Sequence, residues 1–328
     1  MSFGQMPDGS TVSRHRIEGG GLVAHVLSYG AVLQDLRLEG HAPPLVLGFD
    51  EFAPYLTDDS CFGAVVGRCA NRIGGGAFQI DGTQYQLDRN FEGRHHLHGG
   101  AAGAGTRNWE VEAVARDRIT LRLDFADGEM GYPGNMTARC SYACLDGGVL
   151  DIQITAETDA PTLCNFAHHS YWNLDGGATT KNHLMQVDAD RITAVDDGFI
   201  STGETPNVTG TRYDFRTERP IHDDVFIDNN LCLSNARHPL RRVGSLRSTV
   251  SGVTMEMHTT EAGLQVYDAF KMNVEPAGLE GRIYGANAGV ALEPQVWPDA
   301  VNHASFPTAI LRPHETYKQH TQFEISKG

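Results

Sequence analysis

The chain has 328 residues, of which 40% are apolar and 20% charged, with 37 glycines and 14 prolines. This composition indicates a globular, turn-rich protein rather than a disordered one. The formal net charge is −15 and no lysine or arginine run interrupts it, which excludes nucleic acid and anionic membranes as expected partners and leaves a neutral small molecule.

The start of the chain has no basic or apolar leader, and no stretch approaches the roughly 18 apolar residues of a membrane span, so we expect a cytoplasmic protein. The cysteines form no C-x-x-C pair and predict free, mostly buried thiols. Motifs of serine hydrolases, dinucleotide-binding proteins and P-loop proteins are absent, which disfavours those classes. The six cysteines are Cys61, Cys69, Cys140, Cys144, Cys164 and Cys232.

The first segment with unusual chemistry is 67–76, where Arg68 and Arg72 flank Asn71 just before three glycines. Arginine offers rigid, forked donors for sugar hydroxyls, and glycines let the backbone turn sharply beside a ligand. Arg72 and Asn71 are therefore candidate substrate-binding residues. The alternative is a β-turn whose arginines form surface ion pairs.

The second segment contains His95, His96 and His98, followed by two glycines. Alternation along an extended chain would place His96 and His98 on the same side. Histidine transfers protons near neutral pH, but two histidines on one side could also bind zinc if a third ligand were nearby. An ordinary surface cluster is the third alternative.

Apolar residues alternate with polar ones over 119–125, 150–154 and 253–257, which predicts half-buried strands. No helical period exceeds three turns, and no linker divides the chain, so we expect one all-β domain spanning 1–328, built as an antiparallel sandwich or a barrel. Turn dipeptides separate the strands at Asp81-Gly82, Asp127-Gly128, Pro133-Gly134, Asp146-Gly147 and Ser251-Gly252.

In the third segment, 168–174, His168 and His169 adjoin Tyr171 and Trp172. Neighbouring strand residues face opposite ways, so only one of the two histidines can enter a given cleft. The apolar side of a pyranose stacks on an aromatic face, which makes Trp172 a candidate substrate-binding residue. Simple packing of both aromatic rings in the core is the alternative.

The fourth segment, 292–302, begins with Glu293 at the end of the apolar run 290–292. A carboxyl in that position is expected to be partly desolvated, which would raise its pKa toward the range useful to a general base. A salt-bridged strand end is the alternative.

Taken in order, these segments resemble the aldose 1-epimerase (galactose mutarotase) family over nearly the whole chain. The resemblance implies a large antiparallel β-sandwich, the galactose mutarotase-like supersandwich, and an isomerase that interconverts the α and β anomers of a free aldose with no cofactor or metal. Further segments that carry it are Tyr29-Gly30-Ala31, Val46-Leu47-Gly48-Phe49-Asp50, Leu97-His98-Gly99-Gly100, Gly131-Tyr132-Pro133-Gly134-Asn135, Asp228-Asn229-Asn230 and Gln265-Val266-Tyr267.

The resemblance assigns the general base to Glu293 and the general acid to His169, with His98 assisting. It implies that Arg72, Asp228 and Gln265 bind and orient the sugar. Pro294, Asn229 and His168 depart from the family pattern beside these positions, so they bear on substrate preference.

The implied reaction removes the proton of the anomeric hydroxyl and protonates the ring oxygen, opening the ring to an aldehyde that recloses on the other face. A hexose-6-phosphate 1-epimerase of the same fold is the nearest alternative. A non-catalytic carbohydrate-binding protein and a zinc enzyme using His96 and His98 are the others. The expected assembly is a monomer or a homodimer.

Overall fold

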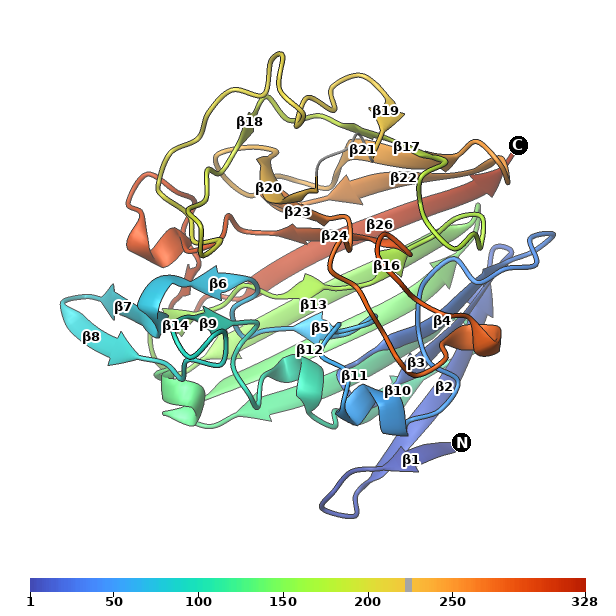
Figure 1. The fold of residues 1–328 in the computed structure, drawn as a ribbon. Coiled ribbons are helices and arrows are strands. Elements are labelled where there is room, and N and C mark those ends of the chain that lie inside the picture. The colour runs from blue at the N-terminus through green and yellow to red at the C-terminus, as the bar shows by residue number, and fades with distance from the viewer. Residues whose placement is uncertain (222–225) are drawn as a thin grey trace.

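The computed structural model describes residues 1–221 and 226–328, and antiparallel strands dominate it (Figure 1). Its largest sheet has nine strands in the order β10-β11-β12-β13-β26-β22-β21-β17-β19. In chain order these strands are β10 (Glu110–Val114), β11 (Arg118–Phe125), β12 (Met136–Leu145), β13 (Val149–Thr158), β17 (His183–Val187), β19 (Arg219–Pro220), β21 (Arg241–Ser248), β22 (Val253–Thr259) and β26 (Tyr317–Lys327).

The three strands predicted from alternation are confirmed, since they lie in β11, β13 and β22. In β12 every second side chain is buried, and all ten residues pair with β13. The turn between these two strands uses Gly147 at φ 81° and Gly148 at φ 78°, a backbone region that L side chains rarely adopt. The turn between β7 (Ala77–Ile80) and β8 (Thr83–Gln86) likewise has Asp81 at φ 50° and Gly82 at φ 84°.

Two smaller sheets cover the nine-stranded sheet. One has the order β1-β2-β3-β4 and the other β16-β24-β23-β20-β18, and in Figure 1 strands β23, β24 and β16 lie over β26 and β13. Their bounds are β1 (Ser2–Gln5), β2 (Thr11–Gly19), β3 (Leu22–Leu27), β4 (Leu33–Leu38), β16 (Tyr171–Trp172), β18 (Arg191–Ile192), β20 (Asp228–Cys232), β23 (Gly263–Tyr267) and β24 (Val290–Gln295).

One buried cluster joins these layers. It contains Leu36 from the four-stranded sheet, Ile152 and Phe323 from the nine-stranded sheet, and Leu264 and Leu292 from the five-stranded sheet. Apolar faces packed between layers define a sandwich. The all-β antiparallel sandwich predicted from the sequence is therefore confirmed.

Four short strand pairs complete the fold; Arg72 lies in β6, and His98 and His169 directly follow β9 and β15. The pairs are β5 (Val65–Val66) with β15 (Ala167–His168), β6 (Arg72–Ile73) with β9 (His96–Leu97), β7 (Ala77–Ile80) with β8 (Thr83–Gln86), and β14 (Thr162–Leu163) with β25 (Ile310–Leu311).

Helical structure in the described residues is limited to 3-10 segments of three or four residues, and none of these helices could cross a membrane. The six cysteines are free and five of them are buried, as predicted. The 3-10 segments are η1 (Ala53–Leu56), η2 (Gly74–Gly76), η3 (Ala104–Thr106), η4 (Glu129–Gly131), η5 (Leu279–Gly281) and η6 (Ala300–Asn302).

Candidate active site

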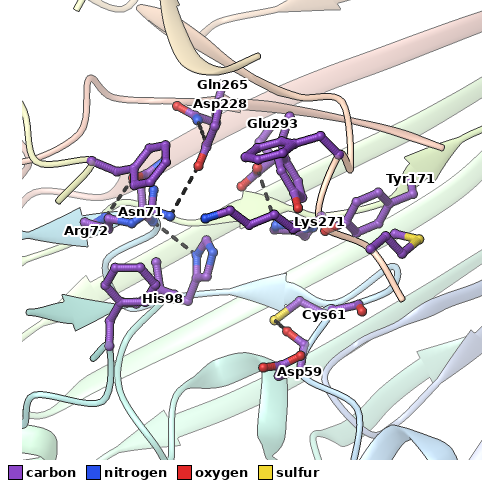
Figure 2. Close-up of a pocket in the computed structure, with 18 of the residues that line it drawn as sticks. Asp59, Cys61, Asn71, Arg72, His98, Tyr171, Asp228, Gln265, Lys271 and Glu293 are labelled. Atoms are coloured by element: carbon purple, nitrogen blue, oxygen red, sulfur yellow. Dashed lines mark hydrogen bonds and ion pairs between the residues drawn. The ribbon is translucent and has the colours of Figure 1, made fainter. Parts of the chain in front are cut away.

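A cavity of about 400 Å³ opens beside the five-stranded sheet, and residues from all four predicted segments line it (Figure 2). We refer to it as the sugar pocket, after the ligand that the resemblance implies. Its lining includes Asn71, Arg72, His98, His169, Asp228, Gln265 and Glu293. Seven of the eight site residues predicted from the sequence are thus brought together from distant parts of the chain.

Strand register positions one wall of the sugar pocket. Gln265 on β23 lies directly opposite Glu293 on β24, and Asp228 on β20 lies opposite Tyr267, two residues after Gln265. Side chains two residues apart on a strand, and those directly opposite, share a face of the sheet. Glu293, Gln265 and Asp228 therefore project from the same face.

Asp228 is held by two donors. The Gln265 Nε2 donates to Asp228 Oδ1 at 2.6 Å, and the Arg72 guanidinium donates to Asp228 Oδ2 at 3.3 Å. The Arg72 guanidinium also lies over the rings of Phe91 and Phe199, at 4.7 and 5.1 Å from their centroids. These contacts fix the orientation of a carboxylate and a guanidinium that can both bind sugar hydroxyls.

Glu293 and His169 face each other in the depth of the sugar pocket, with Glu293 Oε1 3.4 Å from His169 Nε2. The two residues are only 1% and 5% exposed. Glu293 Oε2 and His169 Nδ1 are buried without a hydrogen-bond partner among the described residues. A carboxylate oxygen in that condition is available to a ligand hydroxyl.

Burial shifts both groups toward their neutral forms. Desolvation, reinforced by the nearby Asp228 carboxylate, raises the pKa of Glu293 to about 8, although Arg72 opposes the shift. Desolvation lowers the pKa of His169 to about 4. Near neutral pH the pair therefore holds one titrating proton, and that proton resides on Glu293.

His98 presents a defined tautomer to the sugar pocket. The backbone N–H of Asn71 donates to His98 Nδ1 at 3.1 Å, so the proton of the neutral ring is on Nε2. Burial, together with the neighbouring His169 and Arg72, keeps the pKa of His98 well below its usual value. The His98 and His169 rings lie edge to face with centroids 5.2 Å apart.

His96 does not share a side with His98, and the pairing predicted for a zinc site is wrong. The His96 Nε2 is 2.6 Å from the Tyr132 hydroxyl, and the His96 Nδ1 is 2.8 Å from Asp88 Oδ1. The physical reason is the backbone at His98, whose φ of 53° ends the extended alternation on which the prediction rested.

Ligand atoms of His98, His169 and Glu293 lie within 4.8 Å of one another, so they form the group that could hold a metal ion among the described residues. The assigned tautomer of His98 opposes this use. Its Nδ1 already accepts a backbone N–H, and its Nε2 would have to lose a proton to ligate. The donor set thus fits proton transfer better than metal binding.

Trp172 is not in the sugar pocket, which corrects its prediction as a sugar-stacking residue. It is fully buried and packs against Phe323, with ring centroids 4.6 Å apart. Tyr171 pairs with Ala291, two residues before Glu293, and lines the sugar pocket instead. Strand alternation sends consecutive side chains to opposite faces, and the sequence alone did not say which ring faced inward.

Alternation also separates the two adjacent histidines as predicted. His168 is buried, takes part in a hydrogen bond with Ser170 Oγ at 3.0 Å, and contacts Tyr142 and Phe323.

Arg68 is likewise absent from the sugar pocket, since its guanidinium donates to backbone carbonyls of residues 133 and 134.

Sequence reasoning missed the residues that form the mouth of the sugar pocket. They come from loops, where no alternation or motif indicates a functional residue. They include Asp58, Asp59, Cys61, Phe91, Glu92, Phe199, Phe270 and Lys271. The Lys271 ammonium lies 5.1 Å from the ring centroid of Phe199 and 5.3 Å from that of Phe270, so the rim combines aromatic faces with charged groups.

Replacing Glu293 by glutamine is expected to stabilise the fold. A carboxyl whose pKa rises from 4.5 to about 8 on folding contributes stability that is fully present below pH 4.5 and lost as the pH rises through 8. At pH 7 the free energy of unfolding is reduced by on the order of 3 kcal/mol. Glu293→Gln should restore this amount. Urea unfolding from pH 4.5 to 8.5 measures this, with the exposed Glu275→Gln as a control that should gain nothing. A pH-independent difference would contradict the desolvation of Glu293.

A buried carboxyl that faces an imidazole in a deep pocket has the groups that acid–base chemistry requires. The chain belongs to the aldose 1-epimerase family, whose model, described as aldose 1-epimerase, matches residues 13–324. It is an isomerase that interconverts the α and β anomers of an aldose.

Relatives span almost the full length of the chain. It is 36% identical to galactose mutarotase from Homo sapiens, covering 99% of this chain and 97% of the human protein. It is 30% identical to aldose 1-epimerase from Escherichia coli strain K12, covering 93% and 92%. Among solved structures, a GalM/aldose epimerase homologue from C. elegans superimposes with a TM-score of 0.90 at 31% identity, covering 96% and 99%.

Proposed function

We propose that Glu293 is the general base and His169 the general acid of this anomer interconversion, with a free, unphosphorylated aldose as the substrate. The observation that carries the proposal is the buried carboxyl–imidazole pair, 3.4 Å apart, at the floor of the sugar pocket. Ring opening needs one proton removed from the anomeric hydroxyl and one delivered to the ring oxygen. A carboxylate and an imidazolium at this separation can serve both atoms of one anomeric centre.

Sugar binding favours transfer of the proton from Glu293 to His169. Before binding, the proton of the pair resides on Glu293. An anomeric hydroxyl that donates to Glu293 favours its ionised form, and a ring oxygen that accepts from His169 favours the imidazolium. The bound sugar thereby stabilises the form of the pair that can react.

The reaction then proceeds in balanced steps. Glu293 takes the proton of O1 as His169 protonates O5, the C1–O5 bond breaks, and C1 becomes an aldehyde. Rotation about C1–C2 presents the other carbonyl face. O5 attacks C1 and returns its proton to His169, while the carbonyl oxygen takes the proton from Glu293. His98, as an Nε2–H donor, assists by hydrogen bonding to the sugar.

Arg72, Asn71, Asp228 and Gln265 are proposed to bind and orient the sugar. We expect Arg72→Ala to raise KM by about 10-fold to 100-fold with a smaller change in kcat, since a charge-assisted hydrogen bond contributes about 1.5–3 kcal/mol. Steady-state polarimetry measures both constants. Arg94→Ala, at an exposed arginine outside the sugar pocket, is the control. An unchanged KM would remove Arg72 from the binding role.

The charges of the sugar pocket favour a neutral substrate over a sugar phosphate. Asp58, Asp59 and Glu92 line its mouth, where Lys271 provides the exposed cation. Comparing kcat/KM for fresh α-glucose and α-glucose 6-phosphate tests this point. We expect the free sugar to be preferred by at least about tenfold. A preference for the phosphate would establish the hexose-6-phosphate 1-epimerase alternative instead.

We also propose a single domain, a cytoplasmic location, and a monomer or homodimer. Support for the domain is the buried cluster, whose members run from Ile17 to Ile325. Support for the location is the set of six free cysteines, which is typical of a reducing compartment.

A further inference from the structure

The turn that carries His98 has an unusual backbone. Residues 98, 99 and 100 all have positive φ, at 53°, 89° and 93°, and a residue with a side chain, such as His98, rarely adopts this region. The turn also packs closely against its surroundings, since a Cβ at Gly99 would overlap the carbonyl oxygen of Gly67. The position of His98 therefore depends on the contacts that hold this turn.

The Asp88 carboxylate contacts both ends of the turn. Its Oδ2 accepts the backbone N–H of Ala101 at 3.0 Å, just after the turn. Its Oδ1 lies 2.8 Å from Nδ1 of His96, just before the turn, and a Cβ at Gly100 would overlap the same carboxylate. One side chain from outside the turn thus links the residues that flank His98.

The tautomer of His96 follows from its neighbours. Its Nδ1 faces two oxygens of Asp88, the carboxylate Oδ1 at 2.8 Å and the backbone carbonyl oxygen at 2.9 Å. Both oxygens only accept, so Nδ1 carries the proton and Nε2 accepts from the hydroxyl of Tyr132 at 2.6 Å. Burial lowers the pKa of His96, and His96 and Tyr132 are 0% and 1% exposed. Asp88, His96 and Tyr132 therefore form a chain of polar contacts with a fixed direction.

None of these three side chains lines the sugar pocket, so any effect on the reaction must pass through another residue. His98 is the lining residue in the turn that Asp88 brackets. The strand before the turn has support of its own, because the Asn90 side chain makes two hydrogen bonds to the backbone of Leu97, at 2.8 and 2.9 Å. Loss of an Asp88 contact should therefore displace the turn rather than β9.

We propose that Asp88 is a positioning residue that acts on His98. Its contacts with Ala101 and His96 hold the turn in place. His98 thereby keeps its Nδ1 on the backbone N–H of Asn71 (Figure 2) and presents its Nε2–H to the sugar. A carboxylate is needed, because both of its neighbours are donors and an amide has an acceptor on one side only. The effect on catalysis rests on the proposed function, in which His98 hydrogen-bonds to the sugar.

Asp88→Asn tests the proposal, since the amide keeps the size of the side chain but must turn its NH₂ group toward either His96 or Ala101. We expect kcat/KM for fresh α-galactose, measured by polarimetry, to fall by about tenfold, because a small displacement of a group that contacts the substrate is costly. The matched control is Asp159→Asn, which should stay within about twofold of wild type. Asp159 is exposed, lies outside the sugar pocket, and likewise accepts two donors, the backbone N–H and the side-chain Nδ2 of Asn135, at 2.7 and 2.6 Å.

The same substitution in a His98→Ala background separates positioning from a general structural role. If Asp88 acts through His98, Asp88→Asn should change kcat/KM of His98→Ala by less than about twofold. A loss of about tenfold in both backgrounds, or no loss in either, would overturn the proposal. Tyr132→Phe removes one hydroxyl from the chain of contacts, and it should show a smaller loss with the same dependence on His98.

A second readout needs no sugar. Nitrogen NMR spectra of protein labelled at its histidine nitrogens, with His98→Ala used for assignment, report the tautomer of His98. The wild type should show the Nε2–H form, and Asp88→Asn should show a mixture of both forms. An unchanged tautomer in Asp88→Asn would contradict the positioning role. If instead His98→Ala left kcat/KM unchanged, the role of His98 in the proposed function would fail, so the two failures are distinguishable.

Discussion

Glu293→Gln is expected to lower kcat for anomer interconversion by about 10² to 10⁴, which corresponds to about 3 to 5 kcal/mol in the barrier. Glutamine keeps the shape and hydrogen-bonding oxygen of the side chain but cannot accept the anomeric proton. Glu293 is only 1% exposed, so little solvent reaches this position to act as the base in its place. Polarimetry on freshly dissolved α-galactose measures the rate above the buffer reaction.

The same variant should be more stable than the wild type at neutral pH, because it removes a desolvated carboxyl whose pKa is raised to about 8. Loss of activity with a gain in stability separates a catalytic role from a structural one. Wild-type rates in purified Glu293→Gln would show that another group removes the proton.

His169→Ala is expected to cost a similar factor of about 10² to 10⁴ in kcat. Its pH profile is more informative than its rate. In the wild type, kcat/KM should be highest while the pair holds one proton, between limbs near pH 4 and pH 8 that follow the pKa values of His169 and Glu293. Below the lower limb the pair gains a second proton, and above the upper limb it has none.

In His169→Ala only ionised Glu293 can act, so the low-pH limb of the pair should disappear and the rate should rise, rather than fall, as the pH passes through 8. His168→Asn is the matched comparison, since His168 faces the core and contacts Tyr142 and Phe323 rather than the sugar pocket. A rate that still falls above pH 8 in His169→Ala would show that another group supplies the proton, and the neighbouring ring of His98 is the candidate.

The sandwich could be predicted from the sequence because its strands are half-buried. Each alternating segment, such as 119–125, has one apolar and one polar face. The turns between strands use Gly and Asp where positive φ is required. The arrangement of the layers could not be predicted in this way. The neighbours of β26 in the nine-stranded sheet are β13 and β22, and nothing local in the sequence specifies such distant pairings.

The site could be predicted as a set of residues but not as a geometry. Ordered motifs identified Glu293 and His169, yet their 3.4 Å separation depends on the packing of β24 against the segment between β15 and β16. The two errors have local causes. Positive φ at His98 redirected that side chain relative to His96, and alternation placed Tyr171 rather than Trp172 in the sugar pocket.

Loop residues at the mouth, including Asp59 and Lys271, carried no recognisable signal because loops lack periodicity. Their position at the mouth required coordinates.

The claim that Glu293 and His169 act together in one ring-opening step is tested most directly by the double variant Glu293→Gln/His169→Ala. Its mutarotation rate on fresh α-galactose should be compared with those of the two single variants. Groups that act as a unit are strongly non-additive, so the double variant should be hardly slower than the slower single variant. Losses that multiply would show that the two residues act independently and would contradict the proposed pair.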